Sequence, residues 1–344
     1  MKILIINPYG IGDVLFTTPV ISNLRAAYPQ AAIAYLANRR TADFIKFNPD
    51  IAQVFIYERD DFVGNYRKYL ELFNSIKQEA FDLVFDFSLN SSFGFLSFAC
   101  GIKKRVGFDY RGRGRFLTHR VSMVGFEQRH VIEYYLDLLR LIEIPVKTSQ
   151  MKLDVPDKDV QWAQEWLTRH HIDPDRPLIA VLPGGGASWG KAAKYKRWAV
   201  PKYAHLIDKI IENFDAAIIL MGDSKEEELC RDLVRLAHSP LHVAVGETSL
   251  LGLAALLMRC QVAILNDGGP LHMAVAVGVK TVSIFGPVDP HVYGPYPVSG
   301  HTVVQKKLPC QPCYRSFRMA DCGHISCLGE LSVEEVYRKV RNIL

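Results

Sequence analysis

The feature that most constrains this chain is the stretch at residues 262–277, which reads VAILNDGGPLHMAVAV. Its first four residues are apolar, as in a buried strand, and Pro270 favours the first turn of a helix. Between them, Gly268 and Gly269 allow a turn that is closed to residues with a Cβ atom. A strand is therefore expected to end where a helix begins.

Such a junction favours a phosphate group. The first N–H groups of a helix have no partner within the helix, and its dipole is positive at that end. Asp267 and His272 stand beside the junction, where they would orient the molecule that carries the phosphate. The stretch indicates a nucleotide-diphosphate site. An ordinary strand-to-helix turn in an α/β sheet explains it about equally well, because short glycine motifs match by chance.

Composition limits the class of protein. A chain of 344 residues is long enough for two domains that each bury a core. Hydrophobic residues make up 49% and charged residues 22%, which excludes a disordered or collagen-like chain and favours a globular enzyme. The N-terminal MKILIIN meets a polar residue at once, and no apolar span has membrane length. We therefore expect a cytoplasmic protein.

Apolar strand patterns alternate with helical ones, which predicts an α/β fold with two doubly wound parallel sheets. Strands are expected at 2–6, 33–36, 54–57, 83–87, 105–107, 178–182, 216–221, 241–245, 262–265 and 281–285. Helices are expected at 13–28, around Asp43, at 66–76, around Phe95, and at 130–142, 157–170, 201–213, 225–237 and 250–258, with a capped terminal helix at 332–343. The domains are 1–150 and 157–330, joined by a linker at 147–156. Ligands bind at the carboxyl ends of parallel strands, so the loops at 10–13, 184–186 and 267–269 should face one cleft between the domains.

Three further positions carry candidate chemistry. Asp13 follows the glycines of NPYGIGD, where a general base would lie; a helix-start carboxylate placed by the dipole is the simpler interpretation. Three glycines at 184–186 precede four cations, which favours a diphosphate, and the tryptophans among the cations argue against a solvated loop. Acids follow a strand that ends in MGD, and Glu226 or a neighbouring acid is placed to hydrogen-bond a ribose, or simply to begin a helix.

Together, the motifs GDVLFTTP, PGGGASWG with KRW, MGD followed by acids, and NDGGPLHMA resemble glycosyltransferase family 9, the ADP-heptose:lipopolysaccharide heptosyltransferases. The resemblance covers nearly the whole chain in order and spacing. It implies a GT-B fold of two Rossmann-like domains and an inverting transfer from an ADP-sugar that needs no metal or other cofactor. Many relatives have Thr or Ser where this chain has Gly268, so backbone would replace one side-chain contact to the diphosphate.

The resemblance also implies residue roles. Domain 1–150 would bind the acceptor and carry the catalytic base Asp13. Domain 157–330 would bind the donor, and the helix at 331–344 is a candidate to cross back to the first domain. The implied donor-binding residues are Gly184, Gly185, Gly186, Lys196 on the diphosphate, Glu226 on the ribose, Asp267, Gly268, Gly269 and His272.

The implied activity is transfer of heptose from ADP-heptose to the lipid A-linked inner core of lipopolysaccharide. The enzyme would work as a peripheral protein at the cytoplasmic face of the inner membrane. One alternative is a transferase of the same fold that uses another nucleotide sugar or another cell-surface glycan. Another is a non-catalytic sugar-nucleotide binding protein, although a binder needs no base at Asp13.

A basic segment at residues 103–120 is the candidate acceptor site. An acceptor rich in phosphate and carboxylate matches guanidinium groups, so the expected acceptor-binding residues are Gly12, Arg111, Arg113, Arg115 and Arg120. A solvated loop without a function is the main alternative. A nucleic-acid patch is a weaker one, and we expect no nucleic-acid partner.

Four of the seven cysteines, Cys310, Cys313, Cys322 and Cys327, lie close together near the C-terminus. The CxxC and the later pair are compatible with a structural zinc site, with His324 as a spare ligand. Free thiols are the simpler interpretation, and disulfides are disfavoured in the cytoplasm. No metal is expected to take part in catalysis.

Overall fold

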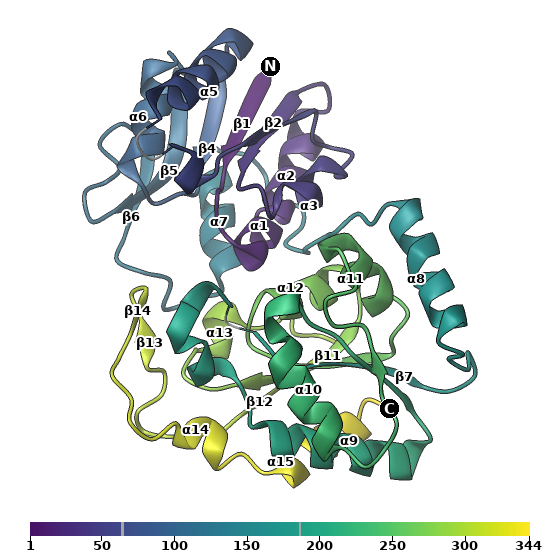
Figure 1. The fold of residues 1–344 in the computed structure, drawn as a ribbon. Coiled ribbons are helices and arrows are strands. Elements are labelled where there is room, and N and C mark those ends of the chain that lie inside the picture. Colours follow the sequence, from purple (N-terminus) through teal and green to yellow (C-terminus); the bar gives the residue numbers. More distant parts are fainter. Residues whose placement is uncertain (63–64, 186) are drawn as a thin grey trace. The chain divides into compact units, whose positions relative to one another are not determined.

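The computed structural model describes residues 1–62, 65–185 and 187–344 and divides the chain into two compact units, Met1–Asp154 and Val155–Leu344 (Figure 1). Within the described residues, each unit contains a six-stranded parallel sheet, and a small antiparallel hairpin accompanies the second. The expected α/β fold with two doubly wound sheets is therefore confirmed.

The first sheet has the strand order β3-β2-β1-β4-β5-β6. Its strands are β1 (Lys2–Ile6), β2 (Ala32–Ala37), β3 (Gln53–Ile56), β4 (Leu83–Asp86), β5 (Lys104–Tyr110) and β6 (His119–Met123). The helices are α1 (Ile11–Phe16), α2 (Thr18–Ala27), α3 (Ala42–Lys46), α4 (Arg59–Phe62), α5 (Tyr66–Glu79), α6 (Ser91–Ala99) and α7 (Val131–Arg140). After Lys2, β1 is apolar because both of its faces are covered. Leu4 and Ile6 share a core with α5 and α6, while α7 packs Tyr135 on Phe87 on the other face.

The second sheet has the order β12-β11-β10-β7-β8-β9. Its strands are β7 (Leu178–Leu182), β8 (Ala217–Leu220), β9 (His242–Val243), β10 (Val262–Asn266), β11 (Lys280–Phe285) and β12 (His301–Gln305). The helices are α8 (Asp157–Arg169), α9 (Val200–Phe214), α10 (Glu227–Leu236), α11 (Leu250–Leu257), α12 (Gly269–Ala276), α13 (Pro290–Tyr293), α14 (Ser326–Gly329) and α15 (Val333–Arg341). Two 3₁₀ segments, η1 (Ala187–Lys196) and η2 (Ser224–Glu226), and the hairpin β13 (Tyr314–Arg315) and β14 (Arg318–Met319) complete the unit.

The helix expected at 13–28 is two helices, α1 and α2, which meet at Thr17. Pro19 has no N–H, so it cannot donate to the helix ladder. The hydroxyls of Thr17 and Thr18 instead donate to the carbonyls of Val14 and Leu15, at 2.6 and 2.7 Å. The proline therefore breaks the helix, and the two threonines satisfy the carbonyls at the break.

The expectation that residues 105–107 form the last strand of the first unit is wrong. β6 follows and pairs in parallel with β5, with Val106 opposite His119. The glycine- and arginine-rich loop joins these two strands and does not end the sheet. β6 was missed because its sequence, HRVSM, has no apolar run.

Two segments after the sheets are held by specific contacts. The Asn23 side chain on α2 accepts from the N–H groups of Lys147 and Thr148 and donates to the carbonyl of Thr148, so the segment after α7 is tied to the first unit. The terminal helix α15 starts with the expected capping box of Ser332 and Glu335. It packs on α9, β11 and β12, so its apolar face is buried within the second unit.

No helix among the described residues has the length and apolar character that crossing a bilayer requires.

Replacing Gly107 with Ala should destabilise the first unit. A Cβ atom there would lie 2.6 Å from the carbonyl oxygen of Asp86 in the neighbouring strand, which the sheet holds in place. We expect Gly107→Ala to lower the free energy of unfolding by about 1–3 kcal/mol, measured by urea titration. The control is Gly329→Ala, where a Cβ meets nothing within 4 Å and the change should stay within about 0.5 kcal/mol. Equal midpoints for the two variants would contradict the strand pairing.

Candidate functional site

Each sheet reverses its strand order at one point, between β1 and β4 in the first unit and between β7 and β10 in the second. The loops that leave such a pair run in opposite directions and make room for a ligand. Asp13 follows β1, Gly184 and Gly185 follow β7, and Asp267 follows β10. Predicted site residues therefore gather at both reversal points.

Asp13 lies in the first turn of α1, after the loop that follows β1. Gly10 is the N-cap residue of this helix and has no side chain to offer, while Asn7 Nδ2 donates to the backbone carbonyl of Asp13 at 2.9 Å. The helix start favours a negative charge at this position. Asp13 and Gly12 are both half-buried, so Asp13 keeps partial access to solvent.

A second carboxylate, Asp86, ends the neighbouring strand β4 and was not predicted. Its side chain accepts from the N–H of Ser88 at 2.9 Å, and the residue is only 5% exposed. Burial raises the pKa of Asp86 to about 6, although the hydrogen bonds from Ser88 lower it. The sequence shows an acid at a strand end, but only the strand order places that strand beside β1.

Tyr9 lies near both carboxylates. Its hydroxyl donates to the carbonyl of Ser88. Burial and then the charges of Asp86 and Asp13 raise the pKa of Tyr9, whereas Arg113 lowers it. Coupling of this kind requires proximity, so both carboxylates and an arginine of the basic segment lie near Tyr9.

Asp109 organises the basic loop. Its Oδ1 accepts from the N–H of Gly114 at 3.0 Å, and its Oδ2 lies 3.6 Å from Arg120 Nη1. A Cβ on Gly114 would lie 2.8 Å from that of Asp109, so the loop closes tightly on this acid. Arg120 is therefore already ion-paired.

The other three arginines divide between two rings. Arg111 and Arg113 lie over Tyr110, at 5.0 and 5.3 Å from the ring centroid. Arg115 lies over Phe116 at 4.8 Å. The four predicted acceptor-binding arginines therefore differ in the side chains that they contact.

In the second unit, Lys196 and Asp267 form a buried ion pair. Lys196 Nζ lies 2.7 Å from Asp267 Oδ2, and the residues are 8% and 3% exposed. Nζ also lies over the ring of Trp189, 4.1 Å from its centroid. Among the described residues, Oδ2 makes no aligned hydrogen bond, so the contact is mainly electrostatic. Both residues were predicted, but not that they pair.

Glu226 connects the loops after β7 and β8. Its Oε1 accepts from the N–H of Gly185 at 2.8 Å, and its Oε2 accepts from the N–H of Asp223 at 3.2 Å in a capping box. Arg197 Nη2 lies 3.7 Å from Oε1. A Cβ on Gly184 would lie 1.9 Å from Oε1, so only glycine leaves room for this carboxylate.

Asn266 was not singled out from the sequence, although it lies inside the NDGGP motif. Its Nδ2 donates to the carbonyls of Pro183 and Gly184 at 2.7 and 2.8 Å, and its Oδ1 accepts from the N–H of Trp198 at 3.1 Å. The end of β10 therefore fixes the glycine loop and the segment that carries Lys196.

The turn before α12 differs from the expectation. Gly268 is extended, with φ 161° and ψ −175°, and Gly269 begins α12, so neither uses left-handed backbone. That conformation occurs at Gly185 instead, with φ 110°. His272 is buried in α12. Gly186 lies outside the described residues.

The C-terminal hairpin packs on the segment that carries Lys196. The rings of Trp189 and Tyr314 lie 4.8 Å apart, and the Tyr195 hydroxyl donates to the carbonyl of Cys322 at 3.2 Å. Trp189 thus lies between Lys196 and the hairpin. The cysteine-rich segment supports the candidate donor site.

All seven cysteines carry free thiols. Burial and then the neighbouring sulfur of Cys310 raise the pKa of Cys313 to about 11, with smaller effects of Cys322 and Cys327. In the part of the chain that the structure describes, no three His, Cys, Asp or Glu residues are arranged to hold a metal ion. The structure thus supplies no ligand set for the zinc interpretation.

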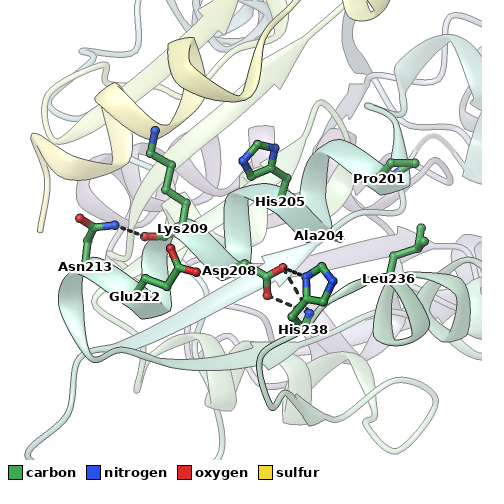
Figure 2. A pocket seen from close by; sticks show the side chains of 9 residues that line it. All are labelled: Pro201, Ala204, His205, Asp208, Lys209, Glu212, Asn213, Leu236 and His238. Carbon is green, nitrogen blue, oxygen red and sulfur yellow. Dashed lines mark hydrogen bonds and ion pairs between the residues drawn. The ribbon is translucent and has the colours of Figure 1, made fainter.

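Figure 2 shows a surface pocket of about 660 Å³ along α9. Asp208 accepts there from the N–H groups of His238 and Ser239 and from His238 Nδ1, which caps the turn after α10. The residues that line the pocket include none of the predicted site residues. We assign it no part in the site.

The model of glycosyltransferase family 9 (heptosyltransferase) matches residues 69–323. The chain belongs to glycosyltransferase family 9. The resemblance stated from the motifs is confirmed, and the protein is a glycosyltransferase. Its activity is thus transfer of a sugar.

Curated relatives of this family 9 glycosyltransferase are heptosyltransferases. Lipopolysaccharide heptosyltransferase 2 of Escherichia coli K12 is 24% identical over 84% of each chain. Lipooligosaccharide heptosyltransferase 2 of Campylobacter jejuni is 25% identical over 100% of this chain and 98% of its own.

Solved structures share the fold. A glycosyl transferase family 9 protein from Veillonella parvula has a TM-score of 0.87 at 22% identity, covering 99% of this chain and 96% of its own. The ADP-heptose lps heptosyltransferase II of E. coli has a TM-score of 0.79 at 21% identity, covering 100% and 98%. The expected GT-B architecture of two Rossmann-like domains is confirmed.

Asp86→Asn should change how stability depends on pH. The pKa of Asp86 is raised from 3.8 to about 6 on folding, so the native state binds the proton more tightly. The unfolding free energy of the wild type therefore falls as pH rises from about 4 to about 6. Asn keeps a side-chain oxygen that accepts from the N–H of Ser88, but it carries no charge, so its burial does not lower stability as pH rises.

The Asn variant should be more stable than the wild type at neutral pH, by about 1–3 kcal/mol, and similar at pH near 4. Urea titrations across this range measure the difference. Asp232→Asn, at an exposed carboxylate on α10, is the control. If the free energies of unfolding of the wild type and Asp86→Asn depend on pH in the same way, the raised pKa of Asp86 is contradicted.

Proposed function

We propose that the enzyme transfers heptose from ADP-heptose to the lipid A-linked inner core of lipopolysaccharide, with inversion and without a metal ion or other cofactor. The observation that carries the proposal is the buried Lys196–Asp267 pair at the β7/β10 reversal, beside the start of α12, in a family 9 chain. The names of the curated relatives support heptose as the sugar and lipopolysaccharide as the acceptor.

On the acceptor side, Asp13 acts as general base. Its carboxylate takes the proton of the acceptor hydroxyl while that oxygen forms the bond to the anomeric carbon. A single displacement of this kind inverts the anomeric centre, because the bond to the diphosphate breaks on the opposite face. Gly12 lets the acceptor approach the backbone next to the base.

On the donor side, Lys196 neutralises the charge that develops on the departing ADP. Asp267 holds the ammonium in place before the donor arrives, and the first N–H groups of α12 at Gly268 and Gly269 add the positive end of a helix. His272 lies in the same helix and completes the proposed donor loop.

Glu226 is the proposed ribose ligand. A carboxylate accepts about four hydrogen bonds, and the backbone N–H groups of Gly185 and Asp223 account for two. The remaining capacity suits two ribose hydroxyls. Gly184, Gly185 and Gly186 would let the nucleotide approach this loop closely.

The arginines are the proposed contacts to acidic groups of the acceptor. Arg113 lowers the pKa of Tyr9, and Asp13 raises the pKa of the same residue. Arg113, and Arg111 over the same Tyr110 ring, are therefore the arginines that we assign to the acceptor beside Asp13. Arg115 and Arg120 would contribute at the periphery. The enzyme would work at the cytoplasmic face of the inner membrane, where a lipid-linked acceptor is presented.

A transferase that uses another nucleotide sugar or another glycan acceptor is the alternative, followed by a non-catalytic sugar-nucleotide binder. ADP release from a panel of ADP-sugars, with and without acceptor, separates the three. The panel is run in EDTA, because the proposed mechanism uses no divalent ion. Activity that returns only with added magnesium or manganese would contradict that mechanism.

Asp13→Asn should abolish transfer and leave donor binding intact, because Asn keeps the size and polarity of the side chain but cannot accept the proton. We expect kcat to fall about 100- to 10,000-fold, measured as acceptor-dependent ADP release. The donor Kd, measured by calorimetry with ADP, should stay within about twofold of wild type. Turnover at a tenth of wild type or better would show that Asp13 is not the base.

Lys196→Ala should weaken donor binding and slow transfer together, because the ammonium meets the diphosphate in ground and transition states. We expect kcat/KM for the donor to fall about 100-fold or more. Lys194→Ala is the matched control, since Lys194 is exposed in the same segment.

Removing Lys196 alone leaves Asp267 buried without its partner, which also lowers stability. The double variant Lys196→Ala/Asp267→Asn removes that charge and should recover the melting temperature without recovering donor binding. Wild-type kinetics in either variant would move the diphosphate contact to another cation of the segment.

A further inference from the structure

Helix α6 exposes an aromatic face. It packs on β4 and β5 of the first sheet (Figure 1), where Phe93 and Leu96 are buried in the core. Phe95 and Phe98, three residues apart and hence on one side of the helix, are 47% and 52% exposed. Two large rings on the water-facing side of one short helix are not explained by the fold.

Phe116, in the loop between β5 and β6, joins these rings. Its centroid lies 5.3 Å from that of Phe95 and 5.8 Å from that of Phe98. The three rings come from two segments, α6 and the loop between β5 and β6, and form one cluster. We call Phe95, Phe98 and Phe116 the aromatic patch.

Cations lie on the aromatic patch. The guanidinium of Arg105 is 5.4 Å from the centroid of Phe98, and that of Arg115 is 4.8 Å from the centroid of Phe116. Arg105 is held by the backbone, since its Nε donates to the carbonyl of Phe116 at 2.6 Å and its Nη1 donates to the carbonyl of Ile102. At least one of the cations is thus fixed beside the rings before any partner arrives.

The stretch of chain that carries the patch is strongly basic. Between residues 91 and 123 the sequence contains seven lysines and arginines and a single acid, Asp109. That acid already accepts from Gly114 and pairs with Arg120. Lys103, directly before β5, is exposed. The patch is therefore apolar at its centre and positive around it.

We propose that the aromatic patch, with Lys103, Arg105 and Arg115, docks on an anionic lipid bilayer. Aromatic rings insert at the level of the headgroups, and cations beside them attract acidic lipids. Charge complementarity favours this occupant over a protein partner, because a bilayer of acidic lipids presents a continuous negative surface to all of the cations at once. The proposal rests on the proposed function in one respect: a lipid-linked acceptor is located in a membrane, so the enzyme must reach the membrane to use it.

The contacts of the arginines suggest two roles within the basic segment, acceptor binding and membrane docking. Arg113 lies near enough to Tyr9 to lower its pKa, and Asp13 acts on the same tyrosine. Arg105 and Arg115 instead lie over rings of the aromatic patch. Docking through the patch would bring the loop between β5 and β6, and with it Arg113, close to the headgroups. Acceptor groups at that depth would then need no extraction from the bilayer to reach the arginines.

Vesicle sedimentation tests the docking without any turnover. Vesicles of equal parts phosphatidylglycerol and phosphatidylethanolamine are compared with vesicles of phosphatidylcholine at low and high salt. The full-length wild type should bind the anionic vesicles and leave them at high salt. Phe95→Ser/Phe98→Ser and, separately, Lys103→Gln/Arg115→Gln should each lower the partition coefficient about tenfold or more.

The matched control is Val234→Ser/Leu236→Ser on α10, which removes two apolar side chains that are 42% and 46% exposed. It should bind the anionic vesicles like the wild type. Retained binding by either patch variant, an equal loss in the control, or equal wild-type binding to both kinds of vesicle would overturn the proposal.

A second measurement separates this proposal from the proposed function. Phe95→Ser/Phe98→Ser should keep the wild-type kcat on an acyl-free lipopolysaccharide core with ADP-heptose, and lose activity only on acceptor embedded in anionic vesicles. Equal kcat on embedded acceptor for this variant and the wild type would overturn the docking. If the wild type turns over neither acceptor, the proposed function fails, and the sedimentation result still decides whether the patch binds lipid.

Discussion

The pairing of β7 with β10 is the constraint on which the candidate donor site depends. Asn266, at the end of β10, donates to the carbonyls of Pro183 and Gly184 and accepts from the N–H of Trp198. One buried amide therefore holds the glycine loop after β7 and the segment that carries Lys196. Since the strands are covered on both faces, the polar groups at their ends have few ways to be satisfied, and this network satisfies them.

Buried charge is handled differently in the two units. Lys196 and Asp267 are buried as an opposite pair, so each offsets the desolvation of the other. Asp86 is buried with a hydrogen bond from Ser88, and burial raises its pKa to about 6. A fixed cation suits a site for a diphosphate. For Asp86, burial favours the uncharged form of the carboxyl group instead.

The basic segment illustrates how contacts divide a run of like residues. Arg120 is paired with Asp109, and Arg115 lies over Phe116. Arg113 lies near enough to Tyr9 to lower its pKa. Cations that are neighbours in sequence thus have an acid, a tyrosine and a phenylalanine as separate partners. Long flexible side chains on a tightly closed loop point to different neighbours, and the ring or acid that each meets decides what it can bind.

Local sequence determined the strand–loop–helix units and the capping box at Ser332, because these depend on periodicity and on residues at helix starts. It also proposed Asp13, Glu226 and Asp267 as site residues from their places after strand ends, whereas Lys196 was proposed from the resemblance to the family. The break at Thr17 depends on Pro19 and was also within reach of the sequence. Strand β6, the pairing of Lys196 with Asp267, and the roles of Asp86 and Asn266 were decided only by the tertiary structure. Each of these depends on which strands lie side by side, and strand order arises from packing between residues far apart in the chain, which no local pattern encodes.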